Sequence, residues 1–358
     1  FYYAPPSGFL ALTTGNLPAP TITAPDEYFN TVLYTGTGAT RSVTGFGHQP
    51  DWLWTKARSN ASNHNLIDAV RGTNKLLLSD VTDAEYTQTI IDSFDSDGFT
   101  TSSAASGINL SGYTYAAWSW KAGGTAVSNT DGAMTSSVSA NTDAGFSIVT
   151  FTSPATSSTA FTVGHGLSSA PEMIITKERD GTLGWLVYHD ELPSPKDNYL
   201  LLNSTAGNSG TITDCWGTSA PTSSVFGMKT TVSINTSKST IAYCFHSVPQ
   251  YSKCGVYTGN GSSDGTFVHC GFRPAWIMVK RTDNTGNWWI HDAKRNTYNV
   301  VDNYLFANSS NAEASYDNLD ILSNGFKLRL ATYQPNTSGG SFIFLAFAEA
   351  PFSKSNAR

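Results

Sequence analysis

The sequence predicts an all-β protein of three tandem antiparallel β-sandwich-like modules, preceded by a short extended N-terminal segment. Three observations predict this fold: Ser, Thr and Asn crowd the polar positions, aromatic residues make up 12% of the chain, and one residue pattern recurs three times. Ser and Asn side chains compete for backbone hydrogen bonds and disfavour helix interiors, whereas Thr and aromatic residues fit a pleated surface. Short strands separated by Gly, Asn and Asp turns are typical of sandwiches.

The recurring pattern is a proline, one variable residue, four mostly apolar residues and a lysine. It occurs at 50–56, 171–177 and 274–280. Each copy is followed by a Leu-rich or Tyr-Leu segment and by a Phe after a turn, and it closes on a strand rich in aromatic residues. These closing strands, at 113–120, 241–245 and 342–348, are apolar on both faces, so we expect them at the centre of a sheet.

The recurrence sets the predicted boundaries. They are a lead-in segment at 1–27, module 1 at 28–122, a Ser/Thr/Asn-rich connector at 123–144, module 2 at 145–248, module 3 at 249–352 and a tail at 353–358. The connector has no core-forming pattern, which predicts an extended link. Only 247–253 separate modules 2 and 3, so we expect these two to pack closely, module 1 to lie further out, and the whole to form an extended rod.

Histidine and acidic residues also recur. Asp68, Asp190 and Asp292 follow apolar residues at similar places, and His189 and His291 stand immediately before two of them. A His-Asp pair suggests a general base. Module 1 has Ile67 in place of the histidine, however, and a feature repeated in tandem modules is more often architectural. We therefore favour a structural role in a sheet or turn.

The motifs of catalysis and metal binding are absent. Asp95, Asp97 and Gly98 resemble the start of a calcium loop but lack its closing glutamate, so they predict a β-turn. The histidines lack metal-site spacing, and neither a GxSxG motif nor a phosphate loop occurs. The sequence thus predicts no catalytic residues, no metal site, no cofactor and no enzymatic activity. Paired carboxylates of a glycan-cleaving enzyme need only spatial proximity, so that alternative stays open.

The chain has four cysteines, too few for a disulfide-built scaffold. Buried free thiols are the favoured interpretation. The alternative is a disulfide between Cys254 and Cys270, which lie at equal distances from the turn-like 259–265 and would face each other if its flanks formed a hairpin.

Nine tryptophans are present, and most fall on predicted strands, which favours a core position. Trp216 lies in the loop-like 213–217 and is the first candidate for an exposed contact with a sugar ring. Trp288 and Trp289 are the next candidates.

The net charge and the hydropathy of the sequence argue against two kinds of partner, nucleic acids and membranes. The formal net charge of −6 carries no basic block, so we expect no nucleic-acid partner. No apolar run approaches the about 18 residues of a membrane span, so we expect no membrane insertion. The chain starts without Met or a signal-peptide pattern, which suggests a fragment or a processed product.

Several phrases of the sequence are similar to a known family. The stretches 1–12 and 28–36 resemble the junction, in marine tailed-phage structural proteins, between a concanavalin-like or SPRY-like domain and repeated modules. Further similar phrases occur at 68–72, 94–99, 139–149 and 164–167. The resemblance covers nearly the whole chain, although the upstream domain is missing. It implies a virion protein of a tail fibre, tail tip or other surface appendage, with no catalytic residues to carry over.

The resemblance and the composition together give the expected function. We expect a phage structural protein on the virion surface that mediates adsorption to a host-surface glycan. Its expected partners are further copies of itself, with a trimer favoured, and other virion proteins. The alternatives are a capsid decoration protein and a secreted adhesin or carbohydrate-binding protein at the cell surface.

Overall fold

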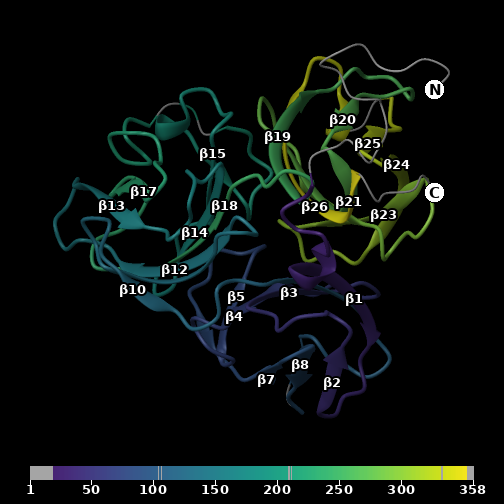
Figure 1. Ribbon diagram of the computed structural model, residues 1–358, viewed down its shortest axis with the longest axis horizontal. Coiled ribbons are helices and arrows are strands. Elements are labelled where there is room, and N and C mark those ends of the chain that lie inside the picture. The colour runs from purple at the N-terminus through teal and green to yellow at the C-terminus, as the bar shows by residue number, and fades with distance from the viewer. Residues whose placement is uncertain are drawn as a thin grey trace.

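The computed structural model describes residues 19–103, 105, 107–208, 210, 212–331 and 334–352. The all-β prediction is confirmed: every named strand pairing is antiparallel, and the helices among the described residues are three-residue 3₁₀ turns, η2 (Pro25–Glu27), η3 (Pro195–Asp197) and η4 (Gln334–Asn336). None of these described helices is long and apolar enough to cross a membrane. Figure 1 shows three lobes, which correspond to three stretches of the chain taken in order.

Module 1 pairs a six-stranded sheet, in the order β1-β9-β3-β4-β5-β6, with a small sheet, β2-β8-β7. Its own core lies between the two and includes Leu53, Ile67 and Phe99. The strands are β1 (Phe29–Thr35), β2 (Arg41–Thr44), β3 (Trp52–Ala57), β4 (Asn65–Asp68), β5 (Lys75–Leu78), β6 (Tyr86–Thr87), β7 (Ile91–Asp95), β8 (Gly98–Thr101) and β9 (Thr114–Trp120).

Module 2 repeats this plan with the order β10-β11-β12-β18-β14-β15-β16 and a small sheet, β13-β17. Val149, Phe226 and Cys244 belong to its own core. The strands are β10 (Val127–Asn129), β11 (Ser136–Asn141), β12 (Phe146–Thr152), β13 (Ala160–Gly164), β14 (Met173–Glu178), β15 (Leu186–His189), β16 (Leu200–Leu201), β17 (Val225–Lys229) and β18 (Ser239–Phe245).

Module 3 is one sheet of eight strands in the order β19-β26-β21-β22-β23-β24-β25-β20. Its own core joins residues of both halves of this sheet, such as Val279 and Phe326, so the module is again sandwich-like. The strands are β19 (Ser252–Thr258), β20 (Phe267–His269), β21 (Phe272–Arg281), β22 (Trp288–Asp292), β23 (Val301–Phe306), β24 (Ala314–Leu322), β25 (Gly325–Leu328) and β26 (Ser341–Pro351).

The closing strand is central in every module, as predicted. β9 lies between β1 and β3, β18 between β12 and β14, and β26 between β19 and β21. The register fixes the equivalent residues, because the proline-led strand pairs with the closing strand in the same way each time. The pairs are Trp52 with Trp120, Met173 with Phe245 and Trp276 with Phe347.

The inner faces of the three sheets meet in one shared core. Trp52 of module 1 stacks on Tyr243 of module 2 with 4.2 Å between ring centroids, and Phe29 of module 1 stacks on Phe347 of module 3 at 5.0 Å. Phe245 of module 2 contacts Phe347 edge-on. All three modules contribute to the same hydrophobic cluster. Each module therefore contacts the other two, and we call this arrangement the three-module ring.

The expected extended rod, with module 1 further out, is therefore wrong. A sheet that is apolar on both faces needs a second cover beyond its own sandwich partner, because each exposed Å² of apolar surface costs roughly 25 cal/mol. A rod would leave most of these inner faces in water. The three-module ring buries all of them, including Trp52, Trp120 and Trp276, each 1% exposed.

The predicted connector at 123–144 is also corrected, because it holds two strands of the module 2 sheet. β11 pairs with β12 across six residue pairs, and β10 pairs with β11. Val138 packs in the module 2 core, while Ser136 and Ser139 are buried and donate hydroxyl hydrogen bonds to the carbonyls of Gly164 and Gly124. Serines that are satisfied in this way make a buried strand look like a polar linker in the sequence.

The turn predicted at Asp95–Gly98 is confirmed as the tight hairpin between β7 and β8. Asp97 accepts hydrogen bonds from the backbone N–H groups of Gly45 and Gly47. Gly98 has a φ of +151°, and a Cβ there would lie 1.9 Å from the Val43 carbonyl oxygen, so no other residue fits.

The disulfide candidate is wrong, because Cys254 and Cys270 are buried free thiols. β19 pairs with β26 and β20 pairs with β25, so their flanks do not form a hairpin. Cys254 faces the shared core and Cys270 faces the core of module 3. Burial raises the pKa of the Cys270 thiol to about 12 and that of Cys254 well above its usual value.

We predict that the native protein does not react with a thiol reagent at pH 8, because all four cysteines are buried and the thiolate is the reactive form. Titration with an aromatic disulfide reagent should give no fast thiols in the folded protein and four in denaturant. A reductant should leave the unfolding temperature unchanged. Two thiols instead of four in denaturant would show that a disulfide exists.

Candidate functional site

The polar chemistry of the molecule is concentrated where modules meet. We name these contacts seam 1/3, seam 2/1 and seam 3/2 after the two modules in each. In every seam one aromatic side chain donates a hydrogen bond from its ring N–H group to a backbone carbonyl of the neighbouring module. This side chain lies at or just before the first residue of β4, β15 or β22. The pairs are His64 Nε2 to Phe306 O at 2.9 Å, Trp185 Nε1 to Leu78 O at 2.8 Å and Trp288 Nε1 to Leu201 O at 2.9 Å. The three seams thus repeat one bond around the ring.

His64 takes this role as a neutral ring. Trp54 Nε1 donates to its Nδ1 at 2.8 Å, so the proton of the ring lies on Nε2, which faces Phe306. Burial lowers the pKa of His64 well below its usual 6.5, and the nearby Lys56 lowers it further. A neutral histidine therefore replaces the tryptophan of the other two seams.

A buried aspartate-arginine pair forms the middle of two seams. In seam 1/3, Trp118 Nε1 donates to Asp292 Oδ2 at 3.0 Å, and Arg295 Nε binds the same oxygen at 2.5 Å. Seam 2/1 has the equivalent set, with Tyr243 OH donating to Asp68 Oδ2 at 2.8 Å and Arg71 Nε at 2.5 Å. The side chains of both pairs are 0% exposed. Buried charges of this kind hold only when each is paired.

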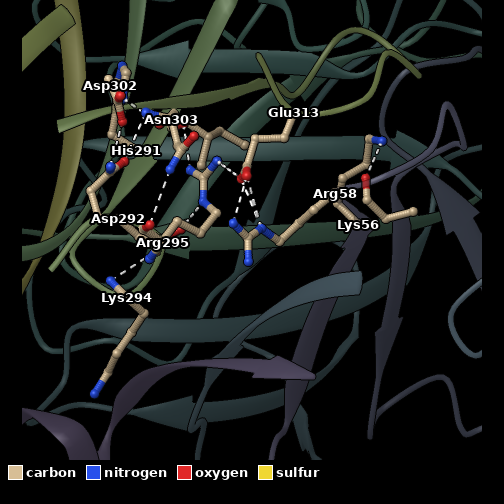
Figure 2. A network of polar contacts seen from close by, with 12 residues as sticks. Lys56, Arg58, His291, Asp292, Lys294, Arg295, Asp302, Asn303 and Glu313 are labelled. Carbon is tan, nitrogen blue, oxygen red and sulfur yellow. Dashed lines mark hydrogen bonds and ion pairs between the residues drawn. The ribbon is translucent and has the colours of Figure 1, made fainter. Parts of the chain in front are cut away.

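Each of these seams ends in a glutamate held between two arginines. In seam 1/3, Glu313 binds Arg58 at 2.7 Å and Arg295 at 3.0 Å, as Figure 2 shows. Its equivalent in seam 2/1 is Glu85, which lies between Arg179 at 2.8 Å and Arg71 at 3.0 Å.

The backbone of each glutamate is fixed in the same way. The N–H of Glu313 donates to the Arg58 carbonyl at 2.8 Å, and that of Glu85 to the Arg179 carbonyl at 2.6 Å. The opposing arginines lower the pKa of the Glu85 carboxyl, although burial alone would raise it.

Seam 3/2 keeps the backbone contact but not the charges. The N–H of Asn208 donates to the Thr282 carbonyl at 2.7 Å, so Asn208 stands where the other seams have glutamate and Thr282 where they have an arginine. Leu192 replaces the second arginine, three residues after His189. His189 Nε2 and Asn208 Oδ1 are buried and have no hydrogen-bond partner among the described residues. A cavity of about 460 Å³ opens beside Asn208 and Thr282.

The lysine of the recurring pattern is buried in each module. Its ammonium group donates to backbone carbonyls: Lys56 to Ala57 and Ser310, Lys177 to Glu178 and Gly181, and Lys280 to Thr205 and Gly286. Lys56 and Lys280 thereby reach across seams. Burial lowers the pKa of Lys56 and Lys177 to about 8 and that of Lys280 to about 7.

The candidate surface tryptophans are all buried, which corrects the sequence interpretation. Trp216 is 0% exposed, and Trp288 and Trp289 are each 1% exposed. Trp216 donates to the Asn198 carbonyl at 3.0 Å and packs edge-on against Tyr188. Its polar neighbours suggest a surface loop, yet the segment folds over the module 2 core, which local sequence does not reveal.

The predicted equivalence of Asp190 with Asp68 and Asp292 is off by one residue. Asp68 pairs with Trp52 in the sheet and Asp292 with Trp276, but the residue paired with Met173 is His189. One step along a strand turns a side chain to the opposite face. Asp190 is accordingly 40% exposed, whereas the other two aspartates are buried.

The structural interpretation of His189 and His291 agrees with their burial in the sheets. Burial, together with the nearby Arg295, lowers the pKa of His291 to about 3, so its ring is neutral, and its Nδ1 lies 3.2 Å from the Asn303 carbonyl (Figure 2). Across the ranges that the structure describes, no group of three or more His, Cys, Asp or Glu side chains is placed to hold a metal ion. The charged groups of seam 1/3 and seam 2/1 bind side chains across the module borders.

Comparison with known proteins places this chain in a family. The model of the family described as "Domain of unknown function (DUF7483)" matches residues 24–351, and the chain belongs to that family. The matched region contains all three modules. No curated protein and no solved structure matches the chain.

We predict that Glu85→Gln destabilises the protein by about 3 kcal/mol, because it leaves two guanidinium groups of a largely buried seam with one carboxylate fewer. Urea unfolding at pH 7.5 measures the change. The matched control is Glu27→Gln, an exposed carboxylate in η2, which should stay within about 0.5 kcal/mol of the parent. Equal effects for both variants would contradict a cohesive role for the seam.

We also predict that stability falls as the pH drops below about 6.5. Burial lowers the pKa of His48 to about 4, of His291 to about 3, and of His64 and His165 below 6.5. Below pH 6.5 these histidines therefore bind protons in the unfolded chain while they remain neutral in the folded chain. Each histidine removes up to about 1.4 kcal/mol per pH unit between 6.5 and its folded pKa, and the histidines cost no stability above 6.5.

Urea unfolding at pH 7.5, 6.5, 5.5 and 5.0 tests this dependence in a range where carboxylates contribute little. A stability that is constant from pH 7.5 to 5.0 would contradict it.

Proposed function

We propose that this member of the DUF7483 family is a structural protein of a tailed-phage virion and works in a tail fibre or another surface appendage without catalysing a reaction. The observation that carries the proposal is the use of the buried polar groups. The aspartates and glutamates of two seams each bind a side chain of the neighbouring module, and Lys56 and Lys280 of the recurring pattern bind carbonyls of a neighbouring module. Polar groups that hold the modules together, instead of lining an active site, are what we expect in a structural component of a virus particle.

The phrases that resemble phage structural proteins support the proposal, because they fall on fold-determining residues. The phrase 68–72 contains Asp68 and Arg71 of seam 2/1. The phrase 94–99 contains the turn of the β7–β8 hairpin, and 139–149 contains the turn between β11 and β12 with the strand ends on either side. Proteins that share these phrases would share the module and its way of packing.

Adsorption to a host glycan is the second part of the proposal. With Trp216, Trp288 and Trp289 buried, the exposed aromatic side chains of module 3 take their place as candidate sugar contacts. Tyr298 is 76% exposed between β22 and β23, and Tyr316 is 55% exposed on β24. Aromatic faces stack on sugar rings, and loops carried by a rigid scaffold are where binding residues gather.

Assembly is the third part. A homo-oligomer, with a trimer favoured, and contacts with other virion proteins suit an appendage, since appendages are usually built with closed symmetry. In such a trimer each subunit would contribute one three-module ring, so the particle would carry nine modules at each position.

A capsid decoration protein is the second candidate, and a specific observation favours it. The modules close into a ring around one core instead of extending as a rod. A compact unit of that kind fits flat on a shell as readily as it fits the end of a fibre.

A cryo-EM map of the native particle tests both candidates. We expect density for the ring in a protruding, symmetric appendage, with module 3 outermost and Tyr298 and Tyr316 turned away from the particle. Density flat on the capsid lattice would replace the appendage by decoration. A particle without this chain would overturn the virion proposal.

A further inference from the structure

We propose that the cavity of seam 3/2 binds a guanidinium group, supplied by an arginine residue of a partner polypeptide or by a free arginine-like molecule. The proposal does not depend on the phage assignment, because it rests only on a comparison of the three seams.

The first step is the template that two seams share. In seam 1/3 and seam 2/1, the glutamate at the rim receives two guanidinium groups, one from each module. The glutamate follows Phe306 or Leu78 by seven residues, and Asn208 follows Leu201 by the same seven. The same position of the backbone is therefore present in all three seams.

The second step is that seam 3/2 keeps the template's backbone while losing its arginines. The N–H of Asn208 binds the Thr282 carbonyl at 2.7 Å, against 2.6 and 2.8 Å in the other seams. The modules thus approach one another in the same way. Thr282 and Leu192 are shorter than arginine, and neither carries a guanidinium. Seam 3/2 thus keeps the backbone arrangement of the arginine site but has no guanidinium group in it.

The third step concerns the position in seam 3/2 that corresponds to the arginine site of the other seams. A cavity lies there, and hydrogen-bond acceptors line it. The cavity of about 460 Å³ is lined by Asn208 and Thr282, together with Glu191, Asp283 and Ser341. Its lining includes no lysine or arginine. Asn208 Oδ1 is buried and has no partner among the described residues, and Glu191 forms no ion pair among them. The volume lies in the range of ligand pockets, roughly 300 to 1,000 Å³.

The lining discriminates by charge and shape. Arg281 binds Asp283 through Nε and Nη2, at 2.9 and 3.0 Å, and so neutralises that carboxylate. Glu191 is left as the unpaired anion. A planar guanidinium can donate to its carboxylate, while the aliphatic stem of the ligand packs on Val256 and Ile343. A neutral urea group of the same shape lacks the charge that Glu191 recognises.

The test is an NMR titration of the full chain with Nα-acetyl-arginine amide, with Nα-acetyl-citrulline amide as the neutral control. We expect saturable shifts with the arginine probe and at least tenfold weaker binding of the citrulline probe. Equal binding of the two probes, or no saturable shift with arginine, would overturn the proposal. Free L-arginine distinguishes the sources: binding as tight as that of the capped probe favours a small molecule, and weaker binding favours an arginine within a polypeptide.

Two variants locate the site. Thr282→Arg supplies the chain's own guanidinium at the position of Arg58 and Arg179, so it should abolish binding of the arginine probe. Thr130→Arg adds the same charge at an exposed position away from the seam and should leave binding unchanged. Unchanged binding in Thr282→Arg would overturn the assignment to this cavity.

Glu191→Gln keeps the test decisive if Thr282→Arg does not fold. Glu191 is exposed, so the substitution should leave the fold intact. We expect at least threefold weaker binding of the arginine probe and no change for citrulline. An unchanged affinity for arginine would again overturn the proposal.

Discussion

The shared aromatic core is the constraint on which the rest of the structure depends. Each module buries one face of its main sheet inside its own sandwich, yet the opposite face is equally apolar. Trp52, Trp120 and Trp276 lie on these opposite faces, as do Phe245 and Phe347. No module can cover its own inner face, so three of them must meet, and the position of every seam follows from that requirement.

The seams show how polar groups are managed at the border of such a core. A charge that is removed from water must be paired, and at these positions each carboxylate has one partner in its own module and a second partner in the neighbouring module. Asp292 therefore binds Arg295 and accepts from Trp118 of another module, while Glu313 joins Arg295 to Arg58. The same contacts therefore pair the buried charges and hold the modules together. A seam without these charges, as between modules 2 and 3, needs less pairing and can hold a cavity.

The repeated pattern in the sequence reveals what the three modules share, but it does not reveal where equivalent residues differ. The proline-led pattern identified, in all three modules, the strand that pairs with the closing strand, and the closing aromatic strands lie at the centre of the sheets as expected. The acidic residues were aligned one position wrongly in module 2, because His189 stands where a neighbour has aspartate. Substitutions such as Asn208 for glutamate and Thr282 for arginine look ordinary in isolation. Their meaning appears only beside the equivalent residues in space.

The sequence by itself determined the strand content, the number of modules and the β7–β8 turn, because periodicity and turn chemistry act over a few residues. Tertiary structure decided everything that joins residues far apart in the chain. It closed the modules into a ring, made β11 part of a sheet, buried Trp216, Trp288 and Trp289, and separated Cys254 from Cys270. Burial and charge pairing depend on which surfaces meet, and in this protein the surfaces that meet come from different modules.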